Sequence, residues 1–507
     1  MKKTISVFLS ILLLFSVLTV AVPAADRSCS CGKAPIILID GMNARNLIRD
    51  KGAENERVAF PFTADDIKAL ITDNKDAVWD MLDGDFSKES ENAVAEGIEA
   101  MLADIAMRDD GTPAYNVTID WAYPTGDVHK EGGYFKYQYD WRLDPFEVAA
   151  GLRDFTEYVK DLTGHDTVHF VGFSQGAITL NTYLSLYGYD GIESCVWYCG
   201  AHNGVEMVGQ LYTGRYKVDA DAAAGYVHGA TENTFEFELL SWILQGLTDI
   251  GVTGGILKIT NKILKLMVKD GTIADITRET FGKMPAIWAM IDDEYYEDAK
   301  TFIFGDETER YSALIEKTDR YHYDVQARSA EIMENARTAA GRIGVITKYG
   351  RRLIPVTEDC DVQSDGVIDA RHTSCGATFA DFGKTLADAS GEQRYRSADG
   401  IVDASTALYP DYTWFIKNVE HSEGCDYADE LVRYISFADH QPDVSENPAY
   451  PQFSVYSKSA GETRPLTKDT DESADKKTVV QIREFFQRIF EAVRRFFSGI
   501  FAQVSTD

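Results

Sequence analysis

The sequence predicts an α/β fold in which a mainly parallel sheet has helices on both faces. Residues 35–39 form a continuous apolar run and residues 192–199 form a mainly apolar stretch, which are typical of strands buried on both sides. Stretches with apolar residues three and four apart, such as residues 146–163, separate these runs and indicate helices. A Gly-x-Ser-x-Gly sequence at residues 172–176 lies between such a strand and such a helix. We therefore expect functional side chains at the carboxyl ends of the strands.

Length and composition fit a globular protein with a large core. The chain has 507 residues, of which 45% are hydrophobic and 26% charged. This length accommodates an α/β domain with inserted segments. The formal net charge of -31 argues against a nucleic-acid partner, because a phosphate backbone would be repelled.

The first 25 residues have the pattern of a signal peptide. Met1-Lys2-Lys3 supplies positive charge, residues 5–20 form an apolar run, and residues 22–25 are small enough for cleavage. A retained membrane anchor is the alternative, although the apolar run is short for a bilayer span. We expect a secreted or extracytoplasmic protein, and the lysine-rich start is of bacterial type.

Seven cysteines follow this segment, and export permits disulfides. Cys360 and Cys375 could close a loop, while the odd count leaves at least one thiol outside any intramolecular pair. The spacing of His and Cys does not resemble a structural zinc site, so we expect neither a metal nor another cofactor.

The elements of the first part of the predicted core, residues 26–202, can be taken in order. A strand at residues 35–39 ends in Asp40-Gly41-Met42-Asn43. The remaining pattern indicates helices at 62–84 and 87–107, strands at 116–121 and 137–142, a helix at 146–163, a strand from 168, a helix from 177, and a strand at 192–199.

Residues 203–342 show few strand patterns and are predicted to form a mostly helical cap. The segment 239–267 is strongly apolar and contains glycines at 251, 254 and 255. An insertion of this length between two sheet strands forms a separate structural unit rather than a connecting loop. Its apolar residues fit either a lipid-facing lid or ordinary packing within the cap.

The second part of the predicted core, residues 343–439, resumes the sheet at residues 343–349, which we assign as the penultimate strand. Two similar acidic sequences follow, at residues 364–369 and 398–403. The last strand is predicted at 412–416, and a helix at 425–437 closes the unit.

Ser174 is the candidate nucleophile. A serine on so tight a strand-to-helix turn needs neighbours without side chains two residues away on either side, and Gly172 and Gly176 meet this need. The turn would present the hydroxyl beside the first N–H groups of the helix, where an oxyanion is stabilised. An ordinary glycine-rich turn is the alternative.

The order of candidate residues completes a Ser-acid-His arrangement. In hydrolases with this turn the histidine follows the last strand, and His421 occupies that place among nine histidines. Asp365 and Asp399 both lie between Ser174 and His421, so either could be the acid.

These residues resemble the α/β-hydrolases, and within them the lecithin:cholesterol acyltransferase-like lipases. The resemblance rests on residues 35–41, on Tyr-Asp-Trp-Arg-Leu at 139–143, on 172–176, and on 399–402 followed by His421. It covers the predicted sheet but not the cap or the chain ends. It implies an α/β-hydrolase fold, Ser174 as nucleophile, His421 as base and Asp399 as acid, preferred over Asp365 because its Asp-Gly-x-Val sequence precedes the closing strand more directly.

The expected activity is that of a serine hydrolase that cleaves or transfers acyl chains of lipid-like carboxylic esters. Backbone N–H groups of Gln175 and of either Met42 or Asn43 are the expected oxyanion donors. The alternatives are a thioesterase or peptidase with the same three side chains, and an inactive hydrolase fold used as a surface binding protein.

The end of the chain is predicted to lie outside the α/β core, as a linker and a helix. Residues 440–477 are rich in Pro, Ser, Asp, Glu and Lys, which predicts a linker. Residues 478–507 place phenylalanine and isoleucine at helical spacing opposite several arginines. Such a basic amphipathic helix suits an anionic membrane surface, and docking on the protein itself or on a second copy is the alternative.

Overall fold

The computed structural model describes residues 29–83, 87–126, 128, 131–218, 257–387, 393–458 and 460–470. The predicted signal peptide, much of the apolar cap segment and the basic C-terminal helix lie outside the described residues. Within the described part of the chain, no helix is long and apolar enough to cross a membrane.

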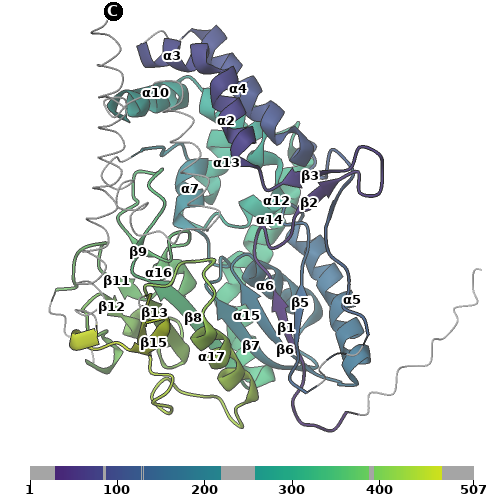
Figure 1. Ribbon diagram of the computed structural model, residues 1–507, viewed down its shortest axis with the longest axis vertical. Helices are drawn as coiled ribbons and strands as arrows, with labels where there is room; N and C mark the ends of the chain where they lie inside the picture. Colours follow the sequence, from purple (N-terminus) through teal and green to yellow (C-terminus); the bar gives the residue numbers. More distant parts are fainter. Residues whose placement is uncertain are drawn as a thin grey trace, which may run out of the picture.

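An eight-stranded, mostly parallel sheet forms the centre of the protein, which confirms the predicted α/β class (Figure 1). Its strand order is β15-β14-β13-β8-β7-β6-β1-β5, and only β15 runs antiparallel to its neighbour. The strands are β1 (Ile36–Ile39), β5 (Tyr134–Tyr137), β6 (Val168–Phe173), β7 (Ile192–Tyr198), β8 (Ile343–Tyr349), β13 (Thr413–Lys417), β14 (Phe453–Ser457) and β15 (Glu462–Pro465).

The central strands are mainly apolar because helices cover both of their faces. Alternate residues of β1 illustrate this: Ile37 and Ile39 pack with one set of helices, whereas Ile36 packs on the opposite face. The first set consists of α5 (Pro145–Thr163), α6 (Gly176–Tyr187) and α15 (Ser329–Ala340), and the opposite face is covered by α17 (Asp426–Phe437).

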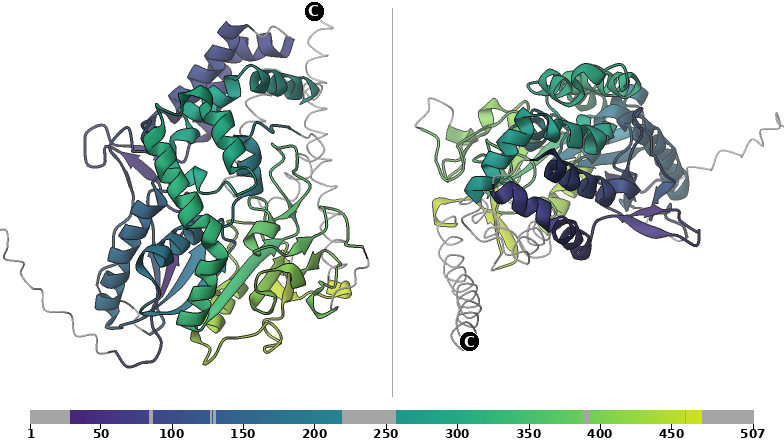
Figure 2. Two further views of the ribbon diagram at one scale, coloured as in Figure 1. Left: turned by 180° about the vertical axis from the view of Figure 1, so that it is seen from behind. Right: turned by 90° about the horizontal axis from the view of Figure 1, so that it is seen from above.

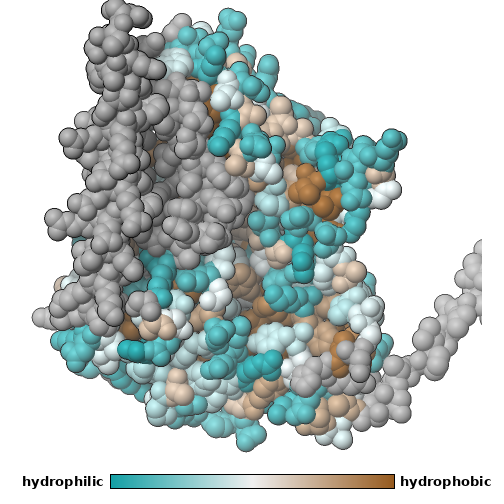
Figure 3. Space-filling model, in the orientation of Figure 1, coloured by the Kyte–Doolittle hydropathy of each residue, from teal (hydrophilic) through white to brown (hydrophobic). Residues whose placement is uncertain are grey.

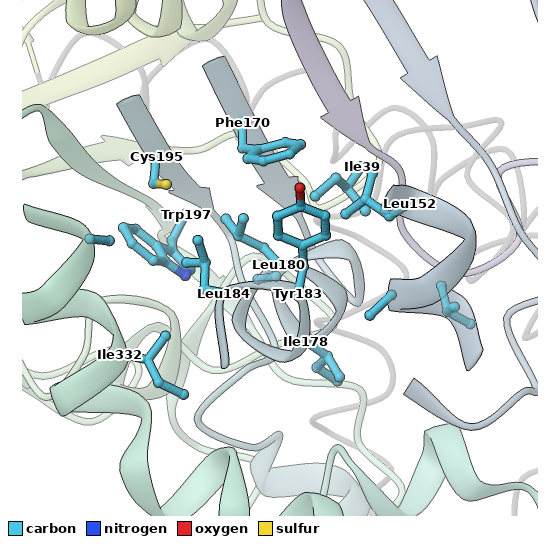
Figure 4. Packing of buried hydrophobic residues seen from close by; sticks show 14 of the residues in the cluster. Ile39, Leu152, Phe170, Ile178, Leu180, Tyr183, Leu184, Cys195, Trp197 and Ile332 are labelled. Carbon is cyan, nitrogen blue, oxygen red and sulfur yellow. The ribbon is translucent and has the colours of Figure 1, made fainter. Parts of the chain in front are cut away.

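A large apolar cluster lies between α6 and the middle of the sheet (Figure 4). Phe170 and Trp197 of the sheet and Leu180 of α6 are fully buried there. Each large apolar side chain buried in this way stabilises the fold by about 1.5–3 kcal/mol. The turn that precedes α6 is therefore attached to a well-packed helix and strand.

Helix α5, which leads into β6, has clear start and stop signals. Asp144 accepts a hydrogen bond from the Phe146 N–H, Pro145 occupies the first turn, and Gly164 ends the helix in a left-handed conformation. The predicted range of 146–163 is thus confirmed to within one residue.

The cap is assembled from two separate parts of the chain. Helices α2 (Ala64–Asp73), α3 (Lys75–Asp83) and α4 (Lys88–Leu102) lie at the same end of the molecule as α10 (Leu257–Lys269), α11 (Thr272–Glu279) and α13 (Tyr296–Phe304) (Figures 1 and 2). Val78 and Val94 pack against Ile263 and Ile273 across this boundary. The other described α-helices of this part are α7 (Glu206–Tyr212), α12 (Pro285–Trp288) and α14 (Ser312–Asp324).

The predicted boundaries between core and cap, at residues 202/203 and 342/343, differ from the packing of the helices. Helices α2–α4 were expected in the core, but their apolar faces pack with the cap. Conversely, α15 lies inside the range 203–342 but packs on the sheet through Ile332 and Met333. Helical periodicity reveals an apolar face without revealing which layer covers it.

Short strands outside the main sheet account for two further differences. The strand expected at 116–121 exists as β4 (Val117–Ile119), but it belongs to a separate antiparallel sheet. There β2 (Leu47–Arg49) lies in the middle and pairs with β4 on one side and β3 (Arg57–Phe60) on the other. The strand expected at 137–142 ends at Tyr137, and the residues after it form a turn. Two hairpins and a short helix follow β8: β9 (Arg351–Arg352), β10 (Gln363–Ser364), α16 (Ala370–Thr373), β11 (Thr378–Phe379) and β12 (Val402–Asp403).

The predicted linker at 440–477 is wrong over its middle part, because β14 and β15 extend the sheet there. Val455 is buried, and the ring of Phe453 stacks on Phe415 of β13 at 5.3 Å. The five-residue strand is too short to stand out among the polar residues around it. For the same reason β8 is not the penultimate strand, since β13, β14 and β15 all follow it.

The surface of the described residues is mainly polar on the face shown in Figure 3. The Cys360–Cys375 bridge that the sequence allowed is not formed: Cys375 Sγ lies 3.6 Å from His202 Nε2 and 3.9 Å from Met333 Sδ. The exposed large apolar side chains of the described residues are Met42, Val58, Tyr115, Tyr123, Leu186, Phe281, Tyr323 and Leu408.

Candidate active site

Ser174 lies on the tight turn between β6 and α6. Its φ of 55° is a left-handed conformation that a non-glycine residue rarely adopts. A Cβ atom on Gly176 would lie 2.0 Å from the carbonyl oxygen of Ile39, and one on Gly172 would lie 2.7 Å from the Ala177 Cα. The Gly-x-Ser-x-Gly spacing is therefore required by the close approach of β1, β6 and α6.

His421 follows β13, and its ring reaches the serine. The distance from His421 Nε2 to Ser174 Oγ is 2.8 Å, which is a hydrogen-bond distance. Both side chains are buried, and the imidazole stacks on Phe173 with ring centroids 5.1 Å apart. The structure thus brings together two of the three predicted side chains, 247 residues apart in the sequence.

The acid beside His421 is Asp365. Its Oδ2 lies 2.6 Å from His421 Nδ1, and the His421 N–H donates to the Asp365 carbonyl at 2.9 Å. The other carboxylate oxygen accepts the N–H groups of Val367 and Ile368. Asp365 is 1% exposed. These four contacts fix both the carboxylate and the histidine that it orients.

Asp399, which the sequence favoured, lies elsewhere. Its carboxylate is 3.0 Å from Lys417 Nζ at the end of β13 and accepts a hydrogen bond from the Tyr349 hydroxyl at 3.1 Å. Its other oxygen accepts the Ile401 N–H. Sequence order could not separate the two aspartates, because both precede His421 in similar turns. The deciding fact is spatial: β10 and α16 hold the Asp365 loop against the end of β8.

Lys348 holds the loop that carries His421. This fully buried ammonium group donates to the carbonyl oxygens of Glu420, His421 and Glu423 at 2.9, 2.9 and 3.1 Å. A lysine has three protons to donate, so these acceptors match its capacity. The residue lies in the middle of an apolar strand pattern, and that polar interruption of β8 was the available signal for its role.

The predicted oxyanion donors lie around Ser174, on β1 and α6. A Cβ on Gly41 would be 2.8 Å from the Ser174 Cβ, so the chain entering Met42 and Asn43 passes directly beside the serine. Asn43 is left-handed, with φ of 60°. Among the described residues, the amide N–H groups of Gln175 and Met42 have no protein acceptor. They are therefore available to a ligand oxygen.

The Tyr-Asp-Trp-Arg-Leu sequence at 139–143 supports both the chain that follows β1 and the turn that precedes α6. The Tyr139 hydroxyl donates to the Asp40 carbonyl at 2.9 Å, and the Trp141 carbonyl accepts from Gln175 Nε2 at 2.7 Å. Arg142 is fully buried and forms a two-contact ion pair with Asp140. Sequence periodicity assigned this string to a strand and missed its role as the support of the turn.

Asp40 adds a buried carboxyl to this support. Burial raises the pKa of Asp40 above its ordinary value, although the hydrogen bond from Gln138 and the charges of Lys136 and Arg45 oppose the rise. Its Oδ2 accepts from Gln138 Nε2 at 2.8 Å. The group stays beside the turn rather than in contact with Ser174, so we assign it a supporting position.

Comparisons with known proteins add little to these observations. No protein family and no curated protein matches the chain. Among solved structures, a chain of the crystal structure of the Tle4–Tli4 complex is similar over 62% of this chain and 75% of its own length, with 13% sequence identity and a TM-score of 0.23. A functional assignment therefore rests on the geometry of the site.

Proposed function

We propose that the protein is a serine hydrolase of the α/β-hydrolase class that acts on carboxylic esters. This proposal rests on two hydrogen-bond distances. Ser174 Oγ lies 2.8 Å from His421 Nε2, and His421 Nδ1 lies 2.6 Å from Asp365 Oδ2. The left-handed backbone at the serine supports the same interpretation, because strain of this kind persists where the surrounding structure imposes it.

The proposed reaction proceeds through an acyl-enzyme. His421 takes the Ser174 proton as Oγ attacks the ester carbonyl, and Asp365 holds the imidazole tautomer and stabilises the imidazolium. The N–H groups of Gln175 and of Met42 or Asn43 stabilise the oxyanion, each by about 10²–10³ in rate. His421 then protonates the leaving alcohol. Water or another alcohol attacks the acyl-enzyme, with His421 again as base.

The proposed substrates are esters with an apolar acyl chain. Met42 is 43% exposed and follows Gly41, which lies against the serine, so an exposed apolar side chain belongs to the residue next to this contact. The lipase resemblance of the motifs points the same way. Export through the N-terminal segment and surface attachment through the C-terminal helix remain part of this proposal, because their sequence patterns suit a lipid surface.

The test is the Ser174→Ala variant. We expect turnover of p-nitrophenyl esters and labelling by a fluorophosphonate probe to be lost, while circular dichroism and elution volume stay unchanged. Ser445→Ala, at an exposed serine, is the control and should keep both activities. Retained turnover in Ser174→Ala would remove the assignment. A wild-type protein that neither reacts with the probe nor turns over esters would favour the binding-protein alternative.

An acyl-chain series defines the substrate class. Esters, thioesters and phospholipids with chains of different length should be compared with the wild-type protein. We expect esters with longer chains to be preferred over short ones and over thioesters. Equal or better thioester turnover would replace the ester assignment with the thioesterase alternative, while the role of Ser174 would stand.

A further inference from the structure

A second cluster of functional groups lies where the cap meets the loop that carries Asp365. Glu206 begins α7, Asp292 follows α12, and His372 lies in α16 (Figure 1). One side-chain ligand atom from each of these residues lies within 4.8 Å of the others. The three residues come from separate segments of the chain, and Asp292 and His372 are buried.

His372 is held as a metal-binding histidine is held. Its Nδ1 lies 2.7 Å from Asp369 Oδ1, which leaves Nε2 to face Asp292 and Glu206. In metal sites the second ring nitrogen of a histidine usually contacts a carboxylate, which fixes the tautomer and the ring. The other Asp369 oxygen accepts the Glu206 N–H at 3.0 Å, so one carboxylate orients two of the three groups.

Asp292 supplies a buried carboxylate oxygen that faces the histidine. Its Oδ1 accepts the N–H groups of Glu294 and Tyr295, whereas Oδ2 has no well-formed hydrogen bond among the described residues. Oδ2 instead forms an ion pair with His372, whose Nε2 lies 3.1 Å away. Asp292 is 5% exposed, and a buried carboxylate oxygen without a well-formed hydrogen bond is costly.

Glu206 completes the set and adds to the charge. Both hydrogen bonds to its carboxylate, from Tyr295 and Gln210, go to Oε1. With Asp292 and Asp369 it places three carboxylates around one imidazole. The ion pairs of His372 with Asp292 and Asp369 offset only part of this negative charge. A divalent cation would offset the rest, because buried carboxylates are stable only when they are paired or bound to metal.

We propose that Glu206, Asp292 and His372 bind a divalent transition-metal ion, with Zn²⁺ as the best match. Imidazole nitrogen and carboxylate oxygen are both zinc ligands, and three protein ligands leave a fourth tetrahedral position for water. Calcium instead prefers six to eight oxygen ligands. Ligands of one tetrahedral zinc lie about 3.4 Å apart, so the Glu206 carboxylate has to move by at most about 1.5 Å. The spacing of histidine and cysteine residues in the sequence did not reveal this site, because its ligands are far apart in the chain and two of them are carboxylates.

The backbone around the site is shaped to bring the segments together. A Cβ on Gly204 would lie 2.4 Å from the Asp292 Cβ, and the Val205 N–H donates to the Met290 carbonyl at 2.8 Å. A bound ion would therefore join α7 and the α12–α13 connection to α16. Because α16 closely follows Asp365, the ion would fasten the acid loop to the cap. The proposal does not depend on the hydrolase activity.

The first experiment measures stoichiometry. The full-length protein is treated with chelator, incubated with ZnCl₂, desalted and analysed by inductively coupled plasma mass spectrometry. We expect about one Zn²⁺ per chain and a rise in Tm of about 3 °C at saturating zinc. CaCl₂ should be retained at much less than one equivalent. A protein that holds no zinc, or that holds calcium alone, would overturn the proposal.

Variants locate the ion. Glu206→Gln and Asp292→Asn should each lose the bound zinc and the Tm rise, and two independent positions keep the test valid if one variant does not fold. His322→Gln is the matched control, since His322 is also buried and lies 3.2 Å from a single carboxylate, Asp293. It should retain one zinc.

A second group on the chain must be separated from this site. Cys29, Cys31 and His165 could also offer three ligand atoms, with Cys31 Sγ 3.2 Å from His165 Nε2. A Cys29→Ser/Cys31→Ser double variant should keep its zinc and its Tm rise. Loss of zinc in the double variant, together with zinc retained in Glu206→Gln, would place the ion at the cysteines and refute the proposed site.

Discussion

At the scale of single residues, Asp365 and Asp399 have similar sequence neighbours but different chemical surroundings. Asp365 orients a histidine that touches a serine, whereas Asp399 neutralises Lys417 and accepts from Tyr349. Both accept backbone N–H groups from the residues that follow them. Both aspartates therefore use one carboxylate oxygen to hold their own turn. The partner of the other oxygen, His421 for Asp365 and Lys417 for Asp399, distinguishes the catalytic candidate from the structural carboxylate.

The two aspartates give the sharpest test of the site. Asp365→Asn should lower kcat for a p-nitrophenyl ester by about 10³–10⁴, because an amide no longer favours the required tautomer or stabilises the imidazolium. Asp399→Asn should keep kcat within a few-fold but lower the free energy of unfolding by about 2 kcal/mol, because the buried Lys417 loses a carboxylate partner. Steady-state kinetics and urea denaturation of both variants measure these effects. A larger loss of kcat in Asp399→Asn would reverse the roles.

Some of the site residues could be predicted from the sequence, and others could not. Ser174 and His421 could be placed because the glycine spacing and the position directly after an apolar strand, β13, are local signals. The choice between two aspartates, the contacts of Lys348 and the approach of Glu206 to Asp292 depend on how distant loops meet. That information is not contained in periodicity or spacing.

At the scale of elements, the β6–α6 turn is held by backbone contacts with very little free space. Gly176→Ala should lower the free energy of unfolding by at least about 3 kcal/mol or prevent folding, because the added methyl would overlap the Ile39 carbonyl. Gly424→Ala is the matched control, since an added Cβ meets nothing within 4 Å there. Thermal unfolding compares the two, and equal Tm values would contradict the described turn.

The loop after β13 offers a second test at this scale. Lys348→Met removes the three hydrogen bonds that hold the His421 loop, so kcat should fall by about 10–100-fold while Ser174 remains in place. The fluorophosphonate labelling rate should fall in parallel, because it also needs the histidine. Lys384→Met, at an exposed lysine, is the control. Stability loss with unchanged labelling would mean that Lys348 is structural only.

Element prediction succeeded for apolar strands and failed for strands that contain many polar residues. The range 343–349 was predicted as a strand and all seven residues of β8 are buried, and the apolar β1 was predicted although it has only four residues. β14 and β15 were missed because serine residues interrupt the first and polar residues dominate the second. The cap boundary failed for another reason: α2–α4 are amphipathic helices, and their partner layer is a property of the tertiary fold.

At the scale of the whole molecule, the sheet separates two helical layers and carries a buried titratable group between them. His169 of β6 is 1% exposed, its Nδ1 lies 2.9 Å from Ser194 Oγ, and its ring packs edge-on against Phe437 of α17. Burial lowers the pKa of His169 to about 4, although the charge of Glu193 opposes the shift. The folded protein therefore holds a neutral imidazole between the sheet and α17.

This shift predicts how the stability of the folded protein depends on pH. The pKa of His169 is lower in the folded chain than the ordinary value of 6.5, so the unfolded chain binds the proton more readily. The contribution of His169 to stability is complete above pH 6.5 and is lost as the pH falls towards 4, by up to about 3 kcal/mol. His169→Gln, which does not titrate, should lose less stability than the wild type between pH 8 and pH 4.5 in urea denaturation.

The control for this prediction is His440→Gln, at an exposed histidine, which should follow the wild-type curve. If His169→Gln and the wild type lose equal stability over this range, His169 is not buried as a neutral group and the packing of α17 on the sheet must differ from that described.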